Sequence, residues 1–387
     1  MRRSLQTFLS ASLLSALLLV SGCGNQASSG SSQGETNPDT GAREVTIGLS
    51  APLTGNSAQY GKDFRNAITL AINEFNAKAG PIKVNLMEMD SKDDPKEAAS
   101  IAQKLVDNQN VIAVIGDFSS TTSMAAAPIY QRSGLVQLSP SASHPDFTRT
   151  GDYIFRNVPI QEVEGDFVAG YGSDMGFKKM AVVHIQNDWG ISAKDSIVKG
   201  FEKRGGEIVS IQSFNPGQKD FANILTTIRE TKPDVLYLGA PYTESALVAQ
   251  QARKLGMNVP LLGVAILYSD KYLELGGQAV ERTYCNSYFF PDDPRPIIKN
   301  FVESYKKQNG KNPDSFAAQA YDSVNMILSI VEQGITDRTG VRDALAKTTD
   351  FPGVTGTTSF NENRDVVKEM VKLEVKDGQF ILHQGSK

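Results

Sequence analysis

The feature that most constrains this fold is an alternation of strand and helix patterns that runs twice along the chain. Short apolar segments with strand character alternate with longer segments whose apolar residues recur at helical spacing, first over residues 43–139 and again over residues 160–266. Strands that are linked in sequence by helices pair in parallel, and the helices cover the faces of the sheet. The sequence therefore predicts an α/β fold with two doubly wound parallel-sheet lobes.

Local signals fix the ends of several of these elements. Asp94 followed by Pro95 is typical of a helix N-cap and first helical residue. Residues 294–349 are rich in helix patterns. The last strand-like segment alternates apolar and polar residues around Asp377 and Gly378, which predicts an edge hairpin with a tight turn.

The N-terminus has the three-part design of a secretory signal peptide. Arg2 and Arg3 precede an uncharged apolar run from Phe8 to Val20, and small residues follow it. The alternative is a retained membrane anchor, but the run is too short and too rich in serine to span a bilayer comfortably. We therefore expect residues 1–22 to be a signal peptide and the mature protein to be exported.

The segment "LVSGC" ends at Cys23 and resembles the lipobox of bacterial lipoproteins, in which the cysteine is lipidated. The alternative is an incidental cysteine near a cleavage site. Residues 24–42 are rich in Gly, Ser, Asn and Gln, so residues 23–42 are expected to be a lipidated cysteine and a flexible tether. Lipid chains would hold the protein at the periplasmic or extracellular face of the cell envelope without a spanning helix.

Charge and cysteine content exclude several classes of partner and site. The net charge of −4 offers no electrostatic footprint for nucleic acid. Once Cys23 is lipidated, Cys285 remains as the single thiol, so no disulfide framework is possible and we expect Cys285 to be buried. The three histidines lie far apart without metal-ligand spacing, so we expect no metal and no cofactor.

Enzyme motifs are incomplete. "GNSAQYGK" looks like a P-loop, but five residues separate Gly55 from Gly61, one too many, and Asp63 stands where a magnesium-binding Ser or Thr is needed. No G-x-G-x-x-G follows the first strand pattern, and the chain has no G-x-S-x-G elbow. The sequence therefore favours a binding protein over an enzyme.

Polar loops follow the strands of the first array, in "APLTGNSAQYG", "GDFSSTTS" and "SPSASHPDFT". In a doubly wound sheet, ligands bind beyond the carboxyl ends of the strands. "GDFSSTTS" opens a predicted helix over residues 120–134, and hydroxyl groups beside its free N–H groups would form an anion site. The alternative is that these hydroxyls only cap the helix. The second array adds Trp189 and Tyr242, for which core and surface packing are the alternatives, as surface packing is for Tyr60.

Taken together, these segments resemble the extracellular solute-binding proteins of the branched-chain amino acid type, with the type I periplasmic-binding fold. The resemblance covers roughly residues 43–387 and rests on "IGLSAPLTGNSAQYG", "DSKDDPKEAASIAQKLV", "VIGDFSSTTSMAAAPIY", "LSPSASHPDFT", "FRNVP", "VVHIQNDWG", "QARKLG", "FFPDDP" and "AAQAYDSV". It implies two lobes that are joined by three crossovers and close on a small ligand. The first lobe would comprise residues 43–160 and 288–354, and the second residues 161–287 and 355–387, with hinges near 158–161, 284–290 and 352–356.

The resemblance also implies a function. The chain would be the solute-binding lipoprotein of an ABC importer. It would act as a monomer, capture a small carboxylate-bearing ligand (a branched-chain or hydrophobic amino acid or a related amine-free acid) by lobe closure, and deliver it to permease subunits. Alternatives are a receptor for amides, urea or aromatic acids, a sensory receptor, or an amide-handling enzyme or regulator on the same fold. By position, the implied ligand-binding residues are Tyr60, Ser119, Ser120, Ser141, Ala142, Ser143, Trp189, Tyr242 (or its neighbour Pro241) and Ala265.

Ala265 departs from the family pattern. The family carries a Glu or Asp at this place, after "LLG", and that acid grips the α-ammonium group of the ligand, whereas the carboxylate lies against the serine hydroxyls. Burying an ammonium group without a counter-charge costs several kcal/mol, and a micromolar complex has only about 8 kcal/mol in total. Either another acid, such as Glu244, Asp188 or Asp270, reaches the site, or the ligand lacks an amine.

Overall fold

The computed structural model describes residues 43–383, which belong to one compact unit. The predicted signal peptide over residues 1–22, the lipidation site Cys23 and the tether that follows it lie outside the described residues. Among the described helices, none combines the length and the apolar character that a membrane span requires.

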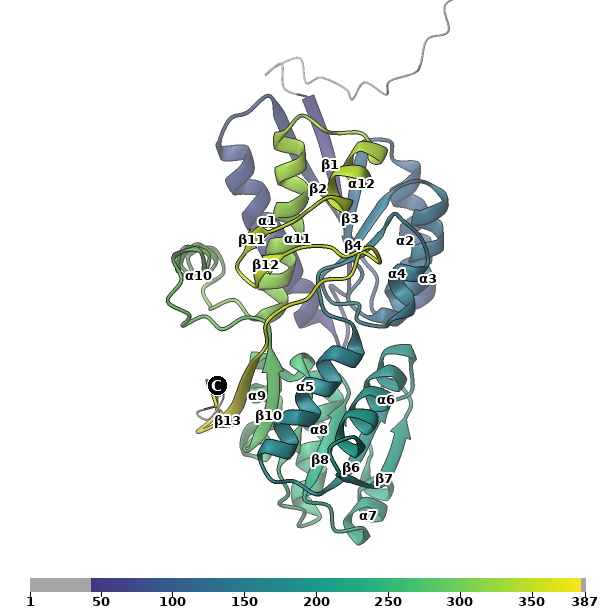
Figure 1. Ribbon diagram of the computed structural model, residues 1–387, viewed down its shortest axis with the longest axis vertical. Helices are drawn as coiled ribbons and strands as arrows, with labels where there is room; N and C mark the ends of the chain where they lie inside the picture. Colours follow the sequence, from purple (N-terminus) through teal and green to yellow (C-terminus); the bar gives the residue numbers. More distant parts are fainter. Residues whose placement is uncertain (1–42, 384–387) are drawn as a thin grey trace, which may run out of the picture. The chain divides into compact units, whose positions relative to one another are not determined.

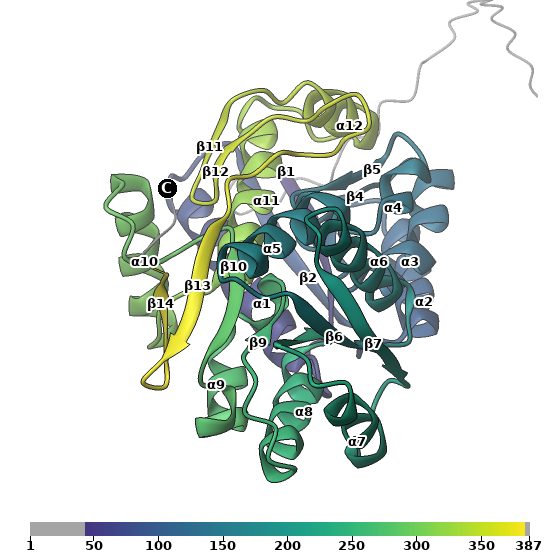
Figure 2. The same ribbon diagram turned by 60° about the horizontal axis from the view of Figure 1, so that its bottom comes forward.

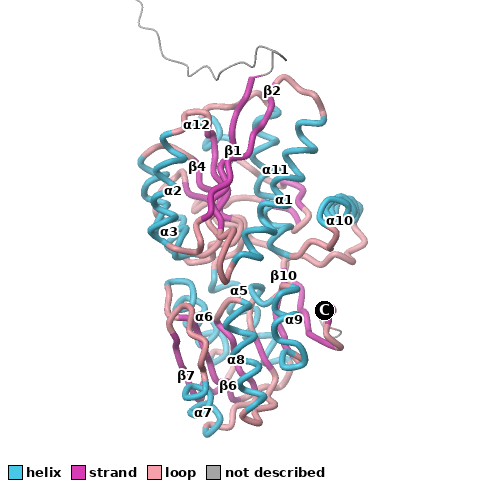
Figure 3. The backbone as a smooth tube through the Cα atoms, turned by 180° about the vertical axis from the view of Figure 1, so that it is seen from behind, coloured by secondary structure: helices cyan, strands magenta, loops and turns pink. Residues whose placement is uncertain are grey.

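The first sheet has the strand order β2-β1-β3-β4-β5, and all its pairs are parallel. Helices α2 and α3 lie on one side of it, and α1 and α11 on the other (Figures 1 and 3). The central strand β3 is buried along its whole length, as expected for a parallel strand that is covered on both faces. The elements of this first lobe are β1 (Arg43–Ala51), α1 (Ala58–Ala77), β2 (Ile82–Asp90), α2 (Pro95–Asp107), β3 (Val111–Gly116), α3 (Ser120–Arg132), β4 (Val136–Ser139), α4 (Asp146–Arg149), β5 (Ile154–Arg156), α10 (Pro296–Asn309), α11 (Ser315–Glu332) and α12 (Arg338–Ala346).

The second sheet has the order β14-β13-β10-β9-β8-β6-β7. Its strands β6 to β10 pair in parallel, whereas β13 and β14 are antiparallel. Helices α5 and α6 cover one face, and α8 and α9 the other (Figure 2). This second lobe comprises α5 (Gln161–Asp174), β6 (Lys179–Ile185), α6 (Asp188–Glu202), β7 (Glu207–Phe214), α7 (Ala222–Glu230), β8 (Val235–Gly239), α8 (Tyr242–Lys254), β9 (Leu261–Leu262), α9 (Asp270–Gly276), β10 (Thr283–Ser287), β13 (Val371–Lys376) and β14 (Gln379–Leu382).

Two local predictions are confirmed. The Asp94 carboxylate caps α2 by accepting hydrogen bonds from the N–H groups of Lys96 and Glu97, at 2.8 and 3.0 Å. Strands β13 and β14 form the expected hairpin at the edge of the second sheet (Figure 2). Its two turn residues, Asp377 and Gly378, both have positive φ, as a tight hairpin turn requires.

The third crossover lies later in the chain than expected. Strands β11 (Phe351–Gly353) and β12 (Gly356–Thr358) pair with each other, and the Phe360 ring packs on Phe155 of the first sheet at 5.3 Å. Asp365 forms an ion pair with Arg156 at 2.7 Å. Residues 355–366, which we expected in the second lobe, therefore stay with the first, and the chain crosses just before β13.

Candidate ligand-binding site

A cavity of about 600 Å³ lies beyond the carboxyl ends of the strands of both sheets. Loops after β1 to β4 line one side, and loops after β6 to β9 line the other. Val158 and Tyr288, from two segments that cross between the lobes, also line the cavity. Such a position is where open α/β sheets bind ligands. The lining includes Asn56, Ser57, Lys92, Asp93, Phe118, Ser119, Thr121, Ser141, Ser143, Val158, Glu164, Ile185, Asn187, Trp189, Pro216, Pro241, Glu244, Val264, Ala265, Ile266, Tyr288, Phe316 and Gln319.

Hydroxyl groups form one part of the cavity surface, which we call the hydroxyl wall: Ser119, Thr121, Ser141 and Ser143. Ser119 is the N-cap of α3, and its Oγ accepts a hydrogen bond from the N–H of Thr122 at 3.2 Å. The Thr121 Oγ1 is buried and has no hydrogen-bond partner among the described residues. The run "GDFSSTTS" therefore caps a helix and also lines the cavity.

The loop after β4 supplies the other two hydroxyls of the wall. Ser141 Oγ donates to the Phe118 carbonyl at 2.6 Å, and Ser143 Oγ donates to Gln161 Oε1 at 2.7 Å. Each oxygen keeps lone pairs, but its proton is already engaged. A ligand carboxylate that takes these protons must therefore displace an internal hydrogen bond.

Ser120 and Ala142 do not line the cavity. Ser120 Oγ accepts a hydrogen bond from the N–H of His144 at 3.1 Å, which joins the start of α3 to the loop after β4. The N–H of Ala142 donates to Ser139 Oγ at 2.9 Å. Both residues therefore stabilise the loops that carry the hydroxyl wall and do not themselves line the cavity.

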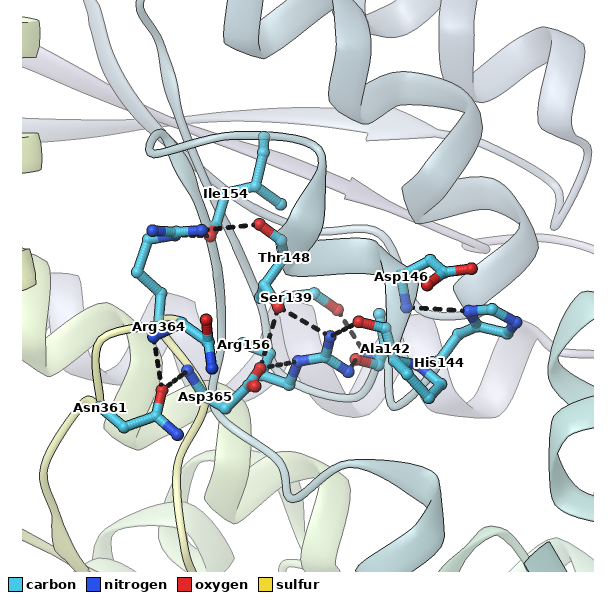
Figure 4. Close-up of polar contacts among 12 residues, drawn as sticks. Ser139, Ala142, His144, Asp146, Thr148, Ile154, Arg156, Asn361, Arg364 and Asp365 are labelled. Atoms are coloured by element: carbon cyan, nitrogen blue, oxygen red, sulfur yellow. Dashed lines mark hydrogen bonds and ion pairs between the residues drawn. The ribbon is translucent and has the colours of Figure 1, made fainter.

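Arg156 holds the loop of the hydroxyl wall in place (Figure 4). Its fully buried guanidinium donates to the carbonyls of Ala142 and Pro145, at 3.1 and 3.3 Å, and to Thr148 Oγ1 at 3.0 Å. Burial lowers the Arg156 pKa to about 10, against the opposing effect of Asp365, so the group stays charged at neutral pH. No motif in the sequence indicated this role.

Tyr60 and Tyr242 also lie outside the cavity lining, and they join the two lobes. The Tyr60 hydroxyl donates to the Ile266 carbonyl at 2.7 Å and accepts from the N–H of Tyr242 at 3.1 Å. The Tyr242 hydroxyl accepts from the N–H of Gln59 at 3.2 Å. Pro241, the alternative to Tyr242, does line the cavity.

Phe118 and Phe316 line the cavity in the role that we expected of Tyr60. Phe118 stacks on Tyr60 with ring centroids 4.3 Å apart, and Phe316 meets Phe118 edge-on at 5.6 Å. Trp189, in the first turn of α6, lines the cavity from the second lobe and is only 7% exposed. Sequence reasoning missed both phenylalanines, because each lies beside a more conspicuous polar run.

The structure shows which acids reach the cavity near Ala265. Ala265 lines the cavity, and so does Glu244, whereas Asp188 and Asp270 do not. An acid that the sequence did not single out, Glu164 in the first turn of α5, also lines it. Its Oε1 accepts from the N–H of Ala265 at 3.3 Å.

Three carboxyl groups of the lining have raised pKa values, chiefly because they are buried. The pKa of Asp93 is raised to about 6, chiefly by burial; the charges of Asp117 and Glu244 also raise it, and hydrogen bonds from Ser119 and Ser57 lower it. Burial also raises the pKa values of Glu164 and Glu244. Lys92 is the one cationic residue of the lining, and it is exposed. Its Nζ lies 3.8 Å from Glu97 Oε1.

Neither a metal nor a reactive thiol is indicated at this site. Across residues 43–383, no group of three or more His, Cys, Asp or Glu side chains is placed to hold a metal ion. Cys285 lies on β10, is fully buried as expected, and has a pKa that burial raises.

Comparison with known proteins agrees with this geometry. The family described as "Periplasmic binding protein" matches residues 44–379. A leucine-, isoleucine-, valine-, threonine- and alanine-binding protein of Pseudomonas aeruginosa is 29% identical over 335 residues, which are 84% of this chain and 88% of that protein.

Two solved structures have the same architecture. The branched-chain amino acid transporter substrate-binding protein LivJ of Streptococcus pneumoniae, in complex with isoleucine, aligns with a TM-score of 0.83 at 28% identity, over 87% of this chain and 97% of that one. The leucine-binding protein LivK of Thermotoga maritima aligns with a TM-score of 0.83 at 28% identity, over 88% and 97%. The predicted fold class is confirmed.

Proposed function

Since this chain belongs to the periplasmic binding protein family, we propose that it is the solute-binding lipoprotein of an ABC importer. It captures a small carboxylate-bearing ligand, a hydrophobic amino acid or a related acid, and delivers it to a membrane permease. The family and the relatives are binding proteins, so the chain is not an enzyme. We also propose that Cys23 carries the lipid anchor and that the protein lies outside the cytoplasm.

The hydroxyl wall is the observation that carries the choice of a carboxylate. It stands at the N-terminus of the 13-residue helix α3, where free N–H groups and the helix dipole favour a negative charge. The Thr121 hydroxyl is buried there without a partner, and a buried polar group of this kind costs free energy until a ligand satisfies it. A carboxylate oxygen accepts that proton.

The rest of the cavity suits an apolar ligand body. The rings of Phe118, Phe316 and Trp189 line it, together with Ile185 and Val264. Burial of an aliphatic or aromatic side chain against them contributes roughly 25 cal/mol for each Å² removed from water. The relatives named above bind branched-chain and small amino acids, which fits this combination of a polar wall and apolar rings.

Lobe closure is the proposed mechanism of capture. Both lobes contribute to the cavity, and hydrogen bonds join them beside it, including one from Thr243 Oγ1 to the Asn56 carbonyl at 3.1 Å. A ligand enters while these bonds are open and is enclosed when they form. The closed form is then the one that a permease distinguishes from the empty protein.

Calorimetric titration of the purified protein tests the proposal. The ligands are leucine, alanine and phenylalanine, each beside the acid that lacks its amine: 4-methylpentanoate, propanoate and 3-phenylpropanoate. We expect at least one of these six compounds to bind with micromolar affinity or better.

Thr121→Val tests the hydroxyl wall. We expect it to weaken the ligand at least about tenfold, the equivalent of 1.4 kcal/mol. Ser133→Ala removes an exposed hydroxyl at the other end of α3 and should leave binding unchanged. Equal affinities for the wild type and Thr121→Val would contradict the carboxylate site.

A further inference from the structure

We infer that Glu164 is the acid that meets an ammonium group of the ligand, so that the cavity selects amine-bearing acids although residue 265 is an alanine. The inference rests on the proposed function and deepens it. It assigns a specificity-determining role to a residue that lies on another element from Ala265 and far from it in sequence.

The position of Glu164 is the first observation. Its Oε1 lies 3.3 Å from the backbone nitrogen of Ala265, and both residues line the same cavity. Glu164 comes from the start of α5, directly after the first crossover. The structure therefore places the Glu164 carboxyl group beside Ala265, whose own side chain has no carboxyl group.

The partners of Glu164 are the second observation. Burial is the largest influence on its pKa and raises it, and the remaining influences come from Asn286, Tyr288, the Ala265 amide and Gln161, none of which is a cation. Asn286 Nδ2 donates to Oε1 at 3.0 Å. A buried carboxylate that has only neutral donors is costly, and a cationic ligand group removes that cost.

The link to the hydroxyl wall is the third observation. Gln161 accepts from Ser143 Oγ at 2.7 Å, and its Nε2 lies 3.5 Å from Glu164 Oε2. One side-chain amide thus separates the end of the cavity that suits a carboxylate from the end that suits an ammonium group. This short separation matches an α-amino acid, whose two charged groups are attached to the same carbon.

Glu244 is the competing acid: its Oε2 is buried and has no hydrogen-bond partner among the described residues, but its surroundings differ from those of Glu164. The groups that act on its pKa, after burial, include Gly217 and Asn56, and its own charge acts on Asp93. The Glu244 charge therefore acts on Asp93, and Glu244 itself interacts with Asn56 in the loop after β1. Glu164 is the acid that lies beside both Ala265 and the hydroxyl wall.

The consequence is selection against acids that lack an amine. When the lobes close on such an acid, the Glu164 carboxylate stays buried without a counter-charge, or takes up a proton. Sites built to pair a polar ligand group reject analogues that lack it by large factors. We expect the wild type to prefer an amino acid to its amine-free partner by at least about a hundredfold.

Glu164→Gln tests the inference in the same calorimetric titration with the three matched pairs. We expect it to weaken the amino acid at least about thirtyfold and to change the affinity for the amine-free partner by less than about threefold. Glu162→Gln is the control, because Glu162 is exposed and two residues away in the same helical turn. A thermal unfolding curve confirms that each variant is folded.

Three results would overturn the inference. If Glu164→Gln weakens both members of a pair equally, the residue has a structural role. If the wild type binds an amine-free acid as tightly as the amino acid, Glu164 selects nothing, although the proposed function stands. If the wild type binds none of the six compounds, the proposed function fails first and the inference falls with it.

Discussion

At the scale of single residues, a site that must neutralise a ligand charge carries a cost while it is empty. Burial raises the pKa of Glu164 above its ordinary value of 4.5. A raised pKa in an acid means that the protonated form is favoured more strongly in the folded state than in the unfolded chain. The resulting stability is fully present below the pKa of the unfolded chain and is lost as the pH rises through the pKa of the folded state.

Glu164→Gln is therefore expected to stabilise the ligand-free protein at neutral pH. The unfolding midpoint should rise by about 2 °C or more at pH 7, and the difference should shrink to near zero at pH 4, where the wild-type carboxyl group is protonated. Differential scanning calorimetry of both proteins across this range makes the measurement. Glu162→Gln, which is exposed, should match the wild type at every pH; a difference for Glu164→Gln that is the same at pH 4 and pH 7 would contradict the explanation.

Arg156 carries the second prediction at this scale. Arg156→Met removes every guanidinium contact to the loop of the hydroxyl wall and leaves Asp365 unpaired (Figure 4). Removing one partner of a buried ion pair lowers the free energy of unfolding by about 3 to 5 kcal/mol. Urea denaturation measures this loss. Arg149→Met breaks the pair with Asp146, in which both side chains are mostly exposed, and should cost less than about 1 kcal/mol. Equal losses in the two variants would refute the assigned role.

At the scale of elements, the hairpin of β11 and β12 fixes the chain just before the third crossover. Asp322, buried on α11, accepts hydrogen bonds from the N–H groups of Val354 and Thr355 at 2.8 and 2.9 Å. Gly353 packs so closely against this carboxylate that a Cβ atom would collide with it. The hairpin therefore needs both the acid and the glycine.

Gly353→Ala is expected to destabilise the protein by about 1 to 3 kcal/mol, the usual cost of overpacking a filled site. Gly80→Ala is the control, because a Cβ at Gly80 would meet no atom within 4 Å. Urea denaturation of both variants gives the comparison. If Gly353→Ala is as stable as Gly80→Ala, the contact with Asp322 does not constrain the hairpin.

The elements with a regular apolar period could be predicted from the sequence, and the irregular ones could not. Both strand–helix arrays and the hairpin at Asp377 carry local signals, and the structure has them where the sequence indicated. Strands β11 and β12 have three residues each, one of them Pro352, so they show no alternation. The prediction of a crossover at 352–356 was wrong because these strands carry no local signal. Their place in the first lobe depends on contacts between residues far apart in the chain, such as Arg156 with Asp365.

The site shows the same division between local and tertiary signals. The hydroxyls of Ser119, Ser141 and Ser143 follow strand ends, and the structure brings them to one cavity. Tyr60 follows a strand end too, but its ring stacks behind Phe118 and its hydroxyl bonds to the other lobe. Glu164 could not be predicted, because its approach to Ala265 depends on how α5 docks after the crossover.

At the scale of the whole molecule, contacts between the lobes set how readily the cavity closes. The Tyr60 hydroxyl bridges the first lobe to the Ile266 carbonyl and the N–H of Tyr242. Removing it leaves two buried backbone groups of the second lobe without this partner. Because those bonds exist only when the lobes touch, the loss falls on the closed form alone.

Tyr60→Phe is therefore expected to weaken the ligand about tenfold, mainly by faster dissociation, and to shift the ligand-free protein toward open forms. Stopped-flow dissociation rates and small-angle X-ray scattering measure the two effects. Tyr305→Phe is the control, since the Tyr305 hydroxyl donates to Asp63 within the first lobe at 3.2 Å. Equal dissociation rates for Tyr60→Phe and the wild type would show that the bridge does not govern closure.

The order in which the chain supplies its lobes bears on biogenesis. The first lobe is held by Asp365, and the second sheet is completed by β13 and β14, which end at Leu382. The first lobe cannot be finished during synthesis until Asp365 has emerged, nor the second until β14 has emerged. An exported chain with this topology can be threaded through a membrane while still unfolded, and both lobes then mature together on the far side.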